Sequence, residues 1–244
     1  MNISLIIPTY NEKENIEKLI KKITELKKDI KIYIIDDSIN NEISLIASKF
    51  ENVDYIYRGK KLGRGSAVID GMKKIISHNS NIIIEMDADF SHHPEEIEKN
   101  LEKFIEEKLD LLISSRYMEK SKIINWSFKR KVFSRLSNIL AKFFLKVPVS
   151  DYTNGYRIYS QRAIKHVIVN CGKIGDGFIV LSEILVQLYY NDFKINETST
   201  IFKNRVRGES SVTLSEILKS LLGLFKIWKI KKKIDKNFIT NTLL

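Results

Sequence analysis

Residues 82–89 read Ile-Ile-Ile-Glu-Met-Asp-Ala-Asp, a short apolar run that ends in two carboxylates. The run from Ile82 to Met86 has the length and composition of a buried strand. Asp87 and Asp89 then emerge at the end of that strand, one residue apart. Two carboxylates at this spacing can hold one hard divalent ion, Mg²⁺ or Mn²⁺, and leave positions for a diphosphate. A pair of solvated turn aspartates is the alternative interpretation of an isolated Asp-x-Asp.

Similar apolar runs recur on both sides of this strand and alternate with segments of helical period. The other predicted strands are 3–7, 32–35, 53–57 and 109–114. The predicted helices are 13–27, 41–50, 64–77 and 94–107. Alternation at this spacing predicts an α/β fold with a mostly parallel central sheet flanked by helices. Ligands of such sheets bind at the carboxyl ends of the strands.

Polar side chains follow two more of the predicted strands. Tyr10 and Glu12 come after the first strand, where a stacking ring and an acceptor could meet a nucleoside. The alternative is a helix start, with Asn11 as N-cap and Glu14 completing a capping box. Asp36-Asp37 after the second strand could accept hydrogen bonds from a base or ribose, or cap the helix near residue 41.

Composition indicates a folded chain with an anionic partner. The 244 residues are 43% hydrophobic, with only 3 Pro and 10 Gly. Lys and Arg outnumber Asp and Glu by 41 to 30, which favours nucleic acid, a membrane surface or a phosphorylated substrate. No nucleic-acid recognition module is evident, so we expect no nucleic-acid partner. The single cysteine, Cys171, cannot form an internal disulfide, and the cytoplasm is the expected compartment.

Two basic amphipathic helices are predicted in the second half, at 128–147 and 214–233. Their apolar stripes and lysines suit an anionic membrane interface, although helices that simply cover the sheet would look similar. Because Lys219 and Lys226 interrupt the longest apolar stretch, no run reaches the roughly 18 residues of a membrane span. We therefore expect a domain over 1–212, followed at 213–244 by a basic helix and tail that contact a membrane peripherally.

Several motifs together resemble those of a known enzyme family. Five occur in order: Pro8-Thr9-Tyr10-Asn11-Glu12, Asp36-Asp37-Ser38, Lys61-Leu62-Gly63-Arg64-Gly65-Ser66-Ala67, Met86-Asp87-Ala88-Asp89-Phe90-Ser91-His92-His93-Pro94 and Ser115-Arg116-Tyr117. This order resembles family 2 inverting glycosyltransferases of the GT-A fold. The later motifs resemble the dolichol-phosphate mannose synthase branch: Asn125-Trp126 with Arg130-Lys131 and Ser134, Asp151 to Tyr159, and Arg205 to Ser210. The resemblance covers roughly residues 1–230.

The resemblance implies a role for individual residues. It places four residues in the nucleoside pocket: Pro8, Tyr10, Glu12 and Asp37. It places the metal ion on Asp87 and Asp89, and the diphosphate of the nucleotide-sugar on Asp87, Ala88 and Asp89. It assigns the acceptor phosphate to Arg116, Arg130 and Ser134. A basic segment that closes over the nucleotide-sugar contains Arg205 and Arg207. The residues expected to be catalytic are Asp89, Arg116 and Arg130.

The implied activity is a metal-dependent, inverting transfer of a sugar to a polyprenyl or dolichyl phosphate on the cytoplasmic face of a membrane. Mannose from GDP-mannose is the first choice of sugar and nucleotide. The chain departs from the family at Ser38, which follows Asp37 without an intervening residue, and at Ser211, where the family has Lys. The alternatives are a glycosyltransferase with a soluble sugar or glycan acceptor, or a catalytically weak protein that binds a nucleotide-sugar.

Overall fold

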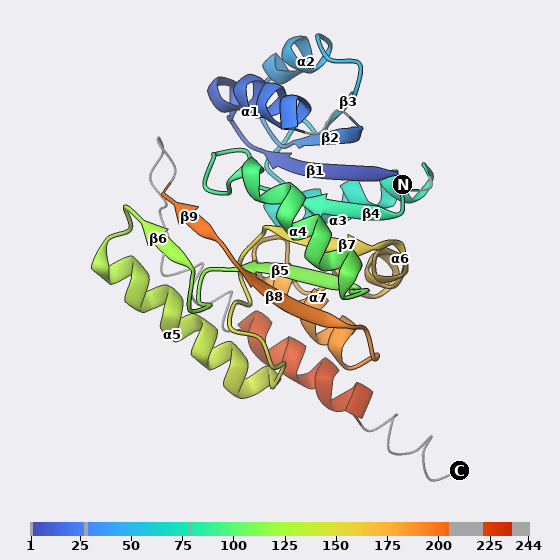
Figure 1. Cartoon of the computed structure of the whole chain (residues 1–244). Coiled ribbons are helices and arrows are strands. Elements are labelled where there is room, and N and C mark those ends of the chain that lie inside the picture. Colours follow the sequence, from blue (N-terminus) through green and yellow to red (C-terminus); the bar gives the residue numbers. More distant parts are fainter. Residues whose placement is uncertain (1, 27–28, 79, 205–221, 236–244) are drawn as a thin grey trace.

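The computed structural model describes residues 2–26, 29–78, 80–204 and 222–235 of the chain. A seven-stranded sheet in the order β3-β2-β1-β4-β7-β5-β8 forms the centre, and a two-stranded sheet, β6-β9, lies beside it (Figure 1). The strands are β1 (Ile3–Thr9), β2 (Ile30–Asp36), β3 (Val53–Tyr57), β4 (Ile82–Glu85), β5 (Leu111–Ser115), β6 (Lys122–Ile124), β7 (Arg157–Ser160), β8 (Ile195–Ser199) and β9 (Ile201–Lys203).

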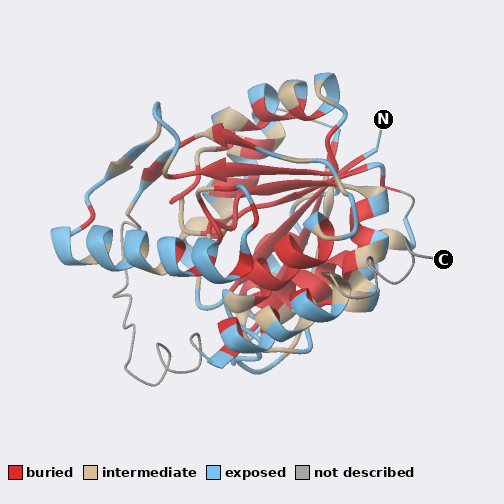
Figure 2. Ribbon diagram, turned by 90° about the horizontal axis from the view of Figure 1, so that it is seen from below, coloured by how far each residue is buried: buried red, intermediate tan, exposed pale blue. Residues whose placement is uncertain are grey.

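Helices cover both faces of the central sheet. They are α1 (Lys13–Leu26), α2 (Glu42–Ala47), α3 (Arg64–Ile76), the short 3-10 helix η1 (Pro94–Glu96), α4 (Ile97–Glu106), α5 (Phe128–Leu145), α6 (Gln161–Asn170) and α7 (Ile179–Tyr189). Leu5 and Ile7 of β1 pack in the core beneath α1, α2 and α4, whereas Ile6 packs in the core beneath α3, α6 and α7. Successive strand residues point to opposite faces, so an unbroken apolar run fills both cores (Figure 2).

The predicted strands and helices of the first half are confirmed, with bounds shifted by a few residues. β1, β2, β3 and β4 are parallel, as are β5 and β8, so the mostly parallel sheet is confirmed. β7 was not predicted from the sequence, and it runs antiparallel between β4 and β5. A strand of four residues has too few side chains to show a period, and its direction depends on pairing partners that are distant in the sequence.

The predicted helix at 128–147 is α5, which runs beside β6 and β9 (Figure 1). Only three of its side chains are buried, those of Asn138, Ala141 and Leu145. Its apolar stripe is exposed and comprises Phe128, Val132, Phe133, Leu136, Ile139, Leu140, Phe143 and Phe144. This stripe therefore does not cover the sheet.

The second predicted basic helix is described only over residues 222–235, which are helical. Leu224 and Ile227 pack in the same core as α7, whereas Leu222 and Phe225 are exposed. The expected division of the chain between residues 212 and 213 lies outside the described residues. No helix in the described ranges is both long and apolar enough to cross a bilayer.

Candidate active site

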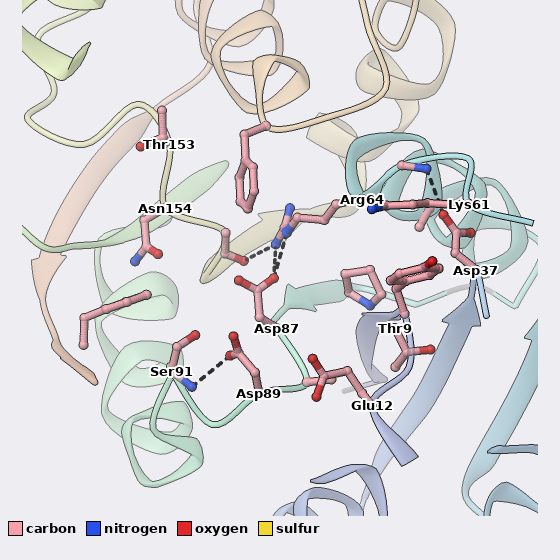
Figure 3. A pocket seen from close by; sticks show the side chains of 18 of the residues that line it. Thr9, Glu12, Asp37, Lys61, Arg64, Asp87, Asp89, Ser91, Thr153 and Asn154 are labelled. Atoms are coloured by element: carbon pink, nitrogen blue, oxygen red, sulfur yellow. Dashed lines mark hydrogen bonds and ion pairs between the residues drawn. The ribbon is translucent and has the colours of Figure 1, made fainter. Parts of the chain in front are cut away.

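A cavity of about 290 Å³ lies at the carboxyl ends of β1, β2 and β4. It brings together residues from segments that are far apart in the sequence (Figure 3). Nine of the predicted site residues line it: Pro8, Tyr10, Glu12, Asp37, Asp87, Ala88, Asp89, Arg116 and Arg130. Parallel strands end at one edge of a sheet, which is why residues after different strands meet here.

Asp87 and Asp89 form the acidic part of this cavity, and both side chains point into it (Figure 3). The backbone N–H of Ser91 donates to Oδ1 of Asp89 over 3.0 Å, which fixes the turn after the strand. The Ser91 hydroxyl also lines the cavity and is buried, with no hydrogen-bond partner among the described residues. Two carboxylates and an unpaired hydroxyl are oxygen ligands of the kind that hard divalent ions take.

Arg64, the first residue of α3, joins the acidic part of the cavity to the core. Its Nε donates to Oδ1 of Asp87 over 2.7 Å, and its Nη1 donates to Oε1 of Glu85 over 2.6 Å. Glu85 is fully buried, and its other oxygen accepts from the Tyr159 hydroxyl over 2.7 Å. Burial alone would lower the pKa of Arg64, but the two carboxylates outweigh this effect and raise it. Arg64 is therefore a permanent cation in the cavity wall.

Gly155 makes room for Arg64. Nη2 of Arg64 lies 3.3 Å from the carbonyl oxygen of Gly155, and a Cβ at residue 155 would overlap this guanidinium. The absence of a side chain at this position thus allows the close approach.

Asp36 and Asp37 are both occupied by contacts within the protein. Asp37 accepts from Nε of Arg58 over 2.6 Å and from the backbone N–H groups of Leu62 and Gly63 over 2.9 and 2.8 Å. These bonds hold the loop before α3 against the end of β2. The N-cap residue of α2 is Asn41, whose side chain makes no capping hydrogen bond, so the interpretation of Asp36-Asp37 as a helix cap is wrong.

Asp36 faces the end of β1 instead, accepting from the Thr9 hydroxyl over 2.9 Å and from the Tyr55 hydroxyl over 2.8 Å. Asn11 was predicted to be the N-cap of α1 as part of a capping box, and this prediction is also wrong. The helix begins at Lys13, and Asn11 has a φ of 59°, two residues before it.

His92 fixes the backbone of the acidic turn. Its Nδ1 accepts from the backbone N–H of Asp87 over 3.2 Å, so the ring proton lies on Nε2. Nε2 lies 2.9 Å from Oδ1 of Asn154, whose amide donates to the carbonyl of Ser114. The buried imidazole therefore connects the strand end at Asp87 to the loop that carries Asn154.

Two arginines form the basic part of the cavity. Arg116 donates to Asp151 through Nε over 2.8 Å and Nη2 over 2.7 Å, and Nη2 also donates to the Thr153 hydroxyl over 2.7 Å. Burial alone would raise the pKa of Asp151, but Arg116 and the surrounding N–H groups hold it below its ordinary value. Arg130 lies in the first turn of α5, and its Nη1 donates to Oδ1 of Asn204 over 2.7 Å.

Within the described ranges, Ser134 is the one predicted site residue that does not line this cavity. Its hydroxyl accepts from the Tyr117 hydroxyl over 2.6 Å. Arg205 and Arg207 lie outside the described residues. Several residues that line the cavity had no predicted role, notably Lys61, Arg64, Ser91, Thr153, Asn154, Phe178 and Phe202. The first five belong to the motifs that carry the family resemblance, so membership of those motifs could have identified them as site residues.

Residues 4–168 match the family described as glycosyl transferase family 2. This is more than half of the chain, which therefore belongs to glycosyl transferase family 2 and is a glycosyltransferase. It is 28% identical over 237 residues to polyprenol monophosphomannose synthase of Mycolicibacterium smegmatis, covering 95% of this chain and 88% of that protein. It is 32% identical over 244 residues to dolichol-phosphate mannosyltransferase of Pyrococcus furiosus, covering 97% of this chain and 66% of that protein.

Solved structures show the same fold. Glucosyl-3-phosphoglycerate synthase from Mycobacterium tuberculosis, crystallised with Mn²⁺, UDP and phosphoglyceric acid, matches with a TM-score of 0.69 over 93% of this chain and 78% of that one. The same enzyme with Mg²⁺ and UDP also matches with a TM-score of 0.69, over 93% and 79%. At 15% and 14% identity these likenesses establish the fold alone, which is the predicted GT-A fold.

Proposed function

We propose that this chain transfers mannose from GDP-mannose to the phosphate of a polyprenyl or dolichyl lipid, with inversion at the anomeric carbon. One observation carries the proposal: a single cavity is lined both by Asp87 and Asp89 and by the basic part formed by Arg116 and Arg130. Such a site suits two phosphorylated ligands, one held through a divalent ion and one held directly by guanidinium groups. The names of the two mannosyltransferase relatives support mannose and a lipid phosphate.

Asp87 and Asp89 would hold Mg²⁺ or Mn²⁺, together with Ser91 or water. The described residues contain no cluster of three His, Cys, Asp or Glu side chains suited to a metal. Two carboxylates are nevertheless the usual protein share for an ion that also binds substrate phosphates. When bound, the ion would neutralise charge on the leaving diphosphate.

The nucleotide would bind along Pro8, Tyr10 and Glu12. The ammonium group of Lys61 lies 4.6 Å from the centre of the Tyr10 ring, beside the space that a nucleoside would occupy. Asp37 would also line the nucleoside pocket, and its carboxylate holds the loop at Leu62 and Gly63, next to Lys61. Arg205 and Arg207 remain proposed contacts of the nucleotide-sugar.

Arg116 and Arg130 would orient the acceptor, with Ser134 further along α5. A phosphate monoester has a second pKa of about 6 and is mostly a dianion at neutral pH. One of its oxygens forms the new bond to the anomeric carbon while the bond to the diphosphate oxygen breaks. The electron pair leaves with GDP, and no proton has to be removed. Positioning of the phosphate by the two arginines therefore replaces a general base.

The apolar stripe of α5 would contact an anionic membrane, with the chain peripheral on its cytoplasmic face. Phe128 is 81% and Phe143 is 72% exposed, and Lys129, Lys131, Arg135 and Lys142 lie on the same helix. Aromatic side chains and lysines on one helix suit the boundary between headgroups and acyl chains. The first turn of α5 also carries Arg130, so a lipid phosphate in the cavity would lie beside the membrane-facing helix.

The test is transfer of radioactive label into a lipid. The purified protein is incubated with polyprenyl phosphate, Mn²⁺ or Mg²⁺, and either labelled GDP-mannose or labelled UDP-glucose, and label in the organic phase is counted. We expect label from GDP-mannose that depends on metal, on the lipid phosphate and on Asp89, with the Asp89→Ala variant as control.

Other outcomes separate the alternatives. Label from UDP-glucose alone would replace the proposed sugar and nucleotide. Label that appears only on an added soluble glycan would contradict the lipid acceptor. Nucleotide binding without any transfer would favour a protein that binds a nucleotide-sugar but turns it over poorly.

A further inference from the structure

Trp126 contacts both arginines of the basic part and lies in the short connection from β6 to α5. The indole is 8% exposed. The guanidinium carbon of Arg130 lies 4.1 Å from the centre of its rings, and that of Arg116 lies 5.4 Å from it. Phe202 of β9 meets the indole edge-on, with centroids 5.3 Å apart, and lies 5.3 Å from the Arg116 guanidinium carbon. One indole is thus shared by two cations from different segments.

Packing alone does not explain an indole at this position. The Nε1–H group of Trp126 is buried and has no hydrogen-bond partner among the described residues. An unpaired buried donor costs about 1–3 kcal/mol, a cost that a phenyl ring would avoid. Trp has the best aromatic face for a guanidinium group, and a partly desolvated contact contributes about 2 kcal/mol. Contact with the two arginines is therefore the property that distinguishes Trp from Phe here.

Each arginine also has a polar partner. Asp151 binds Arg116 through two nitrogens, and Asn204 accepts from Arg130. The indole and these partners together fix the two guanidinium groups before any ligand arrives. Two cations in contact with one indole repel each other, and the electron-rich ring face offsets part of that repulsion. A preformed pair of donors loses little conformational entropy when a phosphate binds.

We propose that Trp126 is a positioning residue that holds Arg116 and Arg130 at the spacing that binds one phosphate monoester. The proposal rests on the proposed function, in which these arginines bind the acceptor phosphate. Trp126 does not line the cavity, so its effect passes through the arginines. No ring contact among the described residues joins the indole to Tyr10, which lies on the nucleotide-sugar side.

The first test compares Trp126→Leu with Trp126→Phe in the transfer reaction. We expect Trp126→Leu to raise KM for a short, water-soluble prenyl phosphate about tenfold, equivalent to about 1.4 kcal/mol. KM for the nucleotide-sugar should change by less than about twofold, because a variant that weakens only the binding of the acceptor raises only the KM for the acceptor. Trp126→Phe should recover only part of the loss, because it keeps a ring face that binds a guanidinium group more weakly than an indole does. An equal rise of both KM values, or no recovery with Phe, would overturn the proposal.

The second test uses fluorescence and does not need turnover. The chain has two tryptophans, so Trp228→Phe leaves Trp126 as the single indole. In that background we expect a saturable change in emission on titration with the short prenyl phosphate, and none with the corresponding prenyl alcohol. Arg130→Gln in the same background should weaken the response about tenfold, because the phosphate loses a charge-assisted bond.

The two tests separate this proposal from the proposed function. Phosphate-dependent emission without any transfer would support the positioning role while contradicting the transferase assignment. Transfer to lipid phosphate with no change in Trp126 emission, and with an unaltered acceptor KM in Trp126→Leu, would overturn the positioning role alone. Circular dichroism and the KM for nucleotide-sugar show whether each variant is folded.

Discussion

Arg64 contacts Asp87 through two nitrogens, with Nε and Nη2 each 2.7 Å from the same carboxylate oxygen. This pair connects the first residue of α3 to the end of β4 and lines the cavity. The same guanidinium group also neutralises the buried Glu85. Arg64 therefore holds a carboxylate of the proposed metal site and stabilises the core beneath it.

Replacing Arg64 by Leu should lower the free energy of unfolding by about 3–5 kcal/mol, because it leaves the Glu85 carboxylate buried without its cation. Arg64→Lys should cost less, since the charge remains. The measurement is urea unfolding followed by circular dichroism. Lys73→Leu, which removes an exposed ion pair with Asp70 on the same helix, is the control and should change stability by less than about 1 kcal/mol. Equal effects of the two Leu variants would contradict the role of Arg64.

Gly155→Ala should displace the Arg64 guanidinium, because the added Cβ would overlap it. We expect a loss of about 1–3 kcal/mol of stability, typical of overpacking. Weaker Mn²⁺ binding, measured by electron paramagnetic resonance, should accompany it because Asp87 loses its partner. Gly177→Ala is the matched control, since nothing lies within 4 Å of a Cβ there. Unchanged stability of Gly155→Ala would show that Arg64 moves aside without cost.

Asp89→Asn should reduce transfer at least about 100-fold and weaken Mn²⁺ binding, because the amide removes a charged oxygen ligand from the proposed metal site. Initial rates and titration of Mn²⁺ by electron paramagnetic resonance measure the two effects. The exposed Glu98 on α4 provides a control, Glu98→Gln, that should alter neither. Loss of transfer with unchanged Mn²⁺ affinity would exclude Asp89 as a ligand.

Glu183→Gln should remove part of the pH dependence of stability. Burial raises the pKa of Glu183 above its ordinary 4.5, although the backbone N–H of Gly172 opposes this shift. The contribution of Glu183 is therefore fully present below pH 4.5 and is lost as the pH rises through the raised pKa. Urea unfolding across this window should show wild type falling relative to Glu183→Gln as the pH increases. Parallel curves for the two proteins would argue against a raised pKa.

Phe128→Ser combined with Phe143→Ser should weaken binding to anionic vesicles by at least about tenfold, because two exposed rings no longer leave water. Flotation or co-sedimentation with vesicles measures binding. Val169→Ser, on the exposed side of α6, is the control and should bind as wild type does. Deletion of residues 231–244 should also weaken binding. Vesicle binding that is unchanged in both altered proteins would contradict a membrane role for these helices.

Much of the fold could be predicted from local patterns. Strands such as Ile3–Thr9 are apolar runs with buried residues on both faces, and helices such as α1 bury Ile16, Leu19, Ile20 and Ile23 at helical spacing. Such periods depend only on neighbouring residues, so the sequence shows them directly. The pairs β6-β9 and β4-β7 escaped prediction because their strands are three or four residues long and join segments far apart in the chain.

The sequence by itself determined the parallel sheet and the position of Asp87 and Asp89 at its carboxyl edge, since apolar runs and the residues after them are local features. Only the tertiary structure decided the partners of the charged groups. Asp37 holds the loop at Leu62 and Gly63, Arg64 binds Asp87 and Glu85, and Trp126 contacts Arg116 and Arg130. Most of these contacts join residues of different strands, helices and loops, and no local period encodes which side chains meet after the chain has folded.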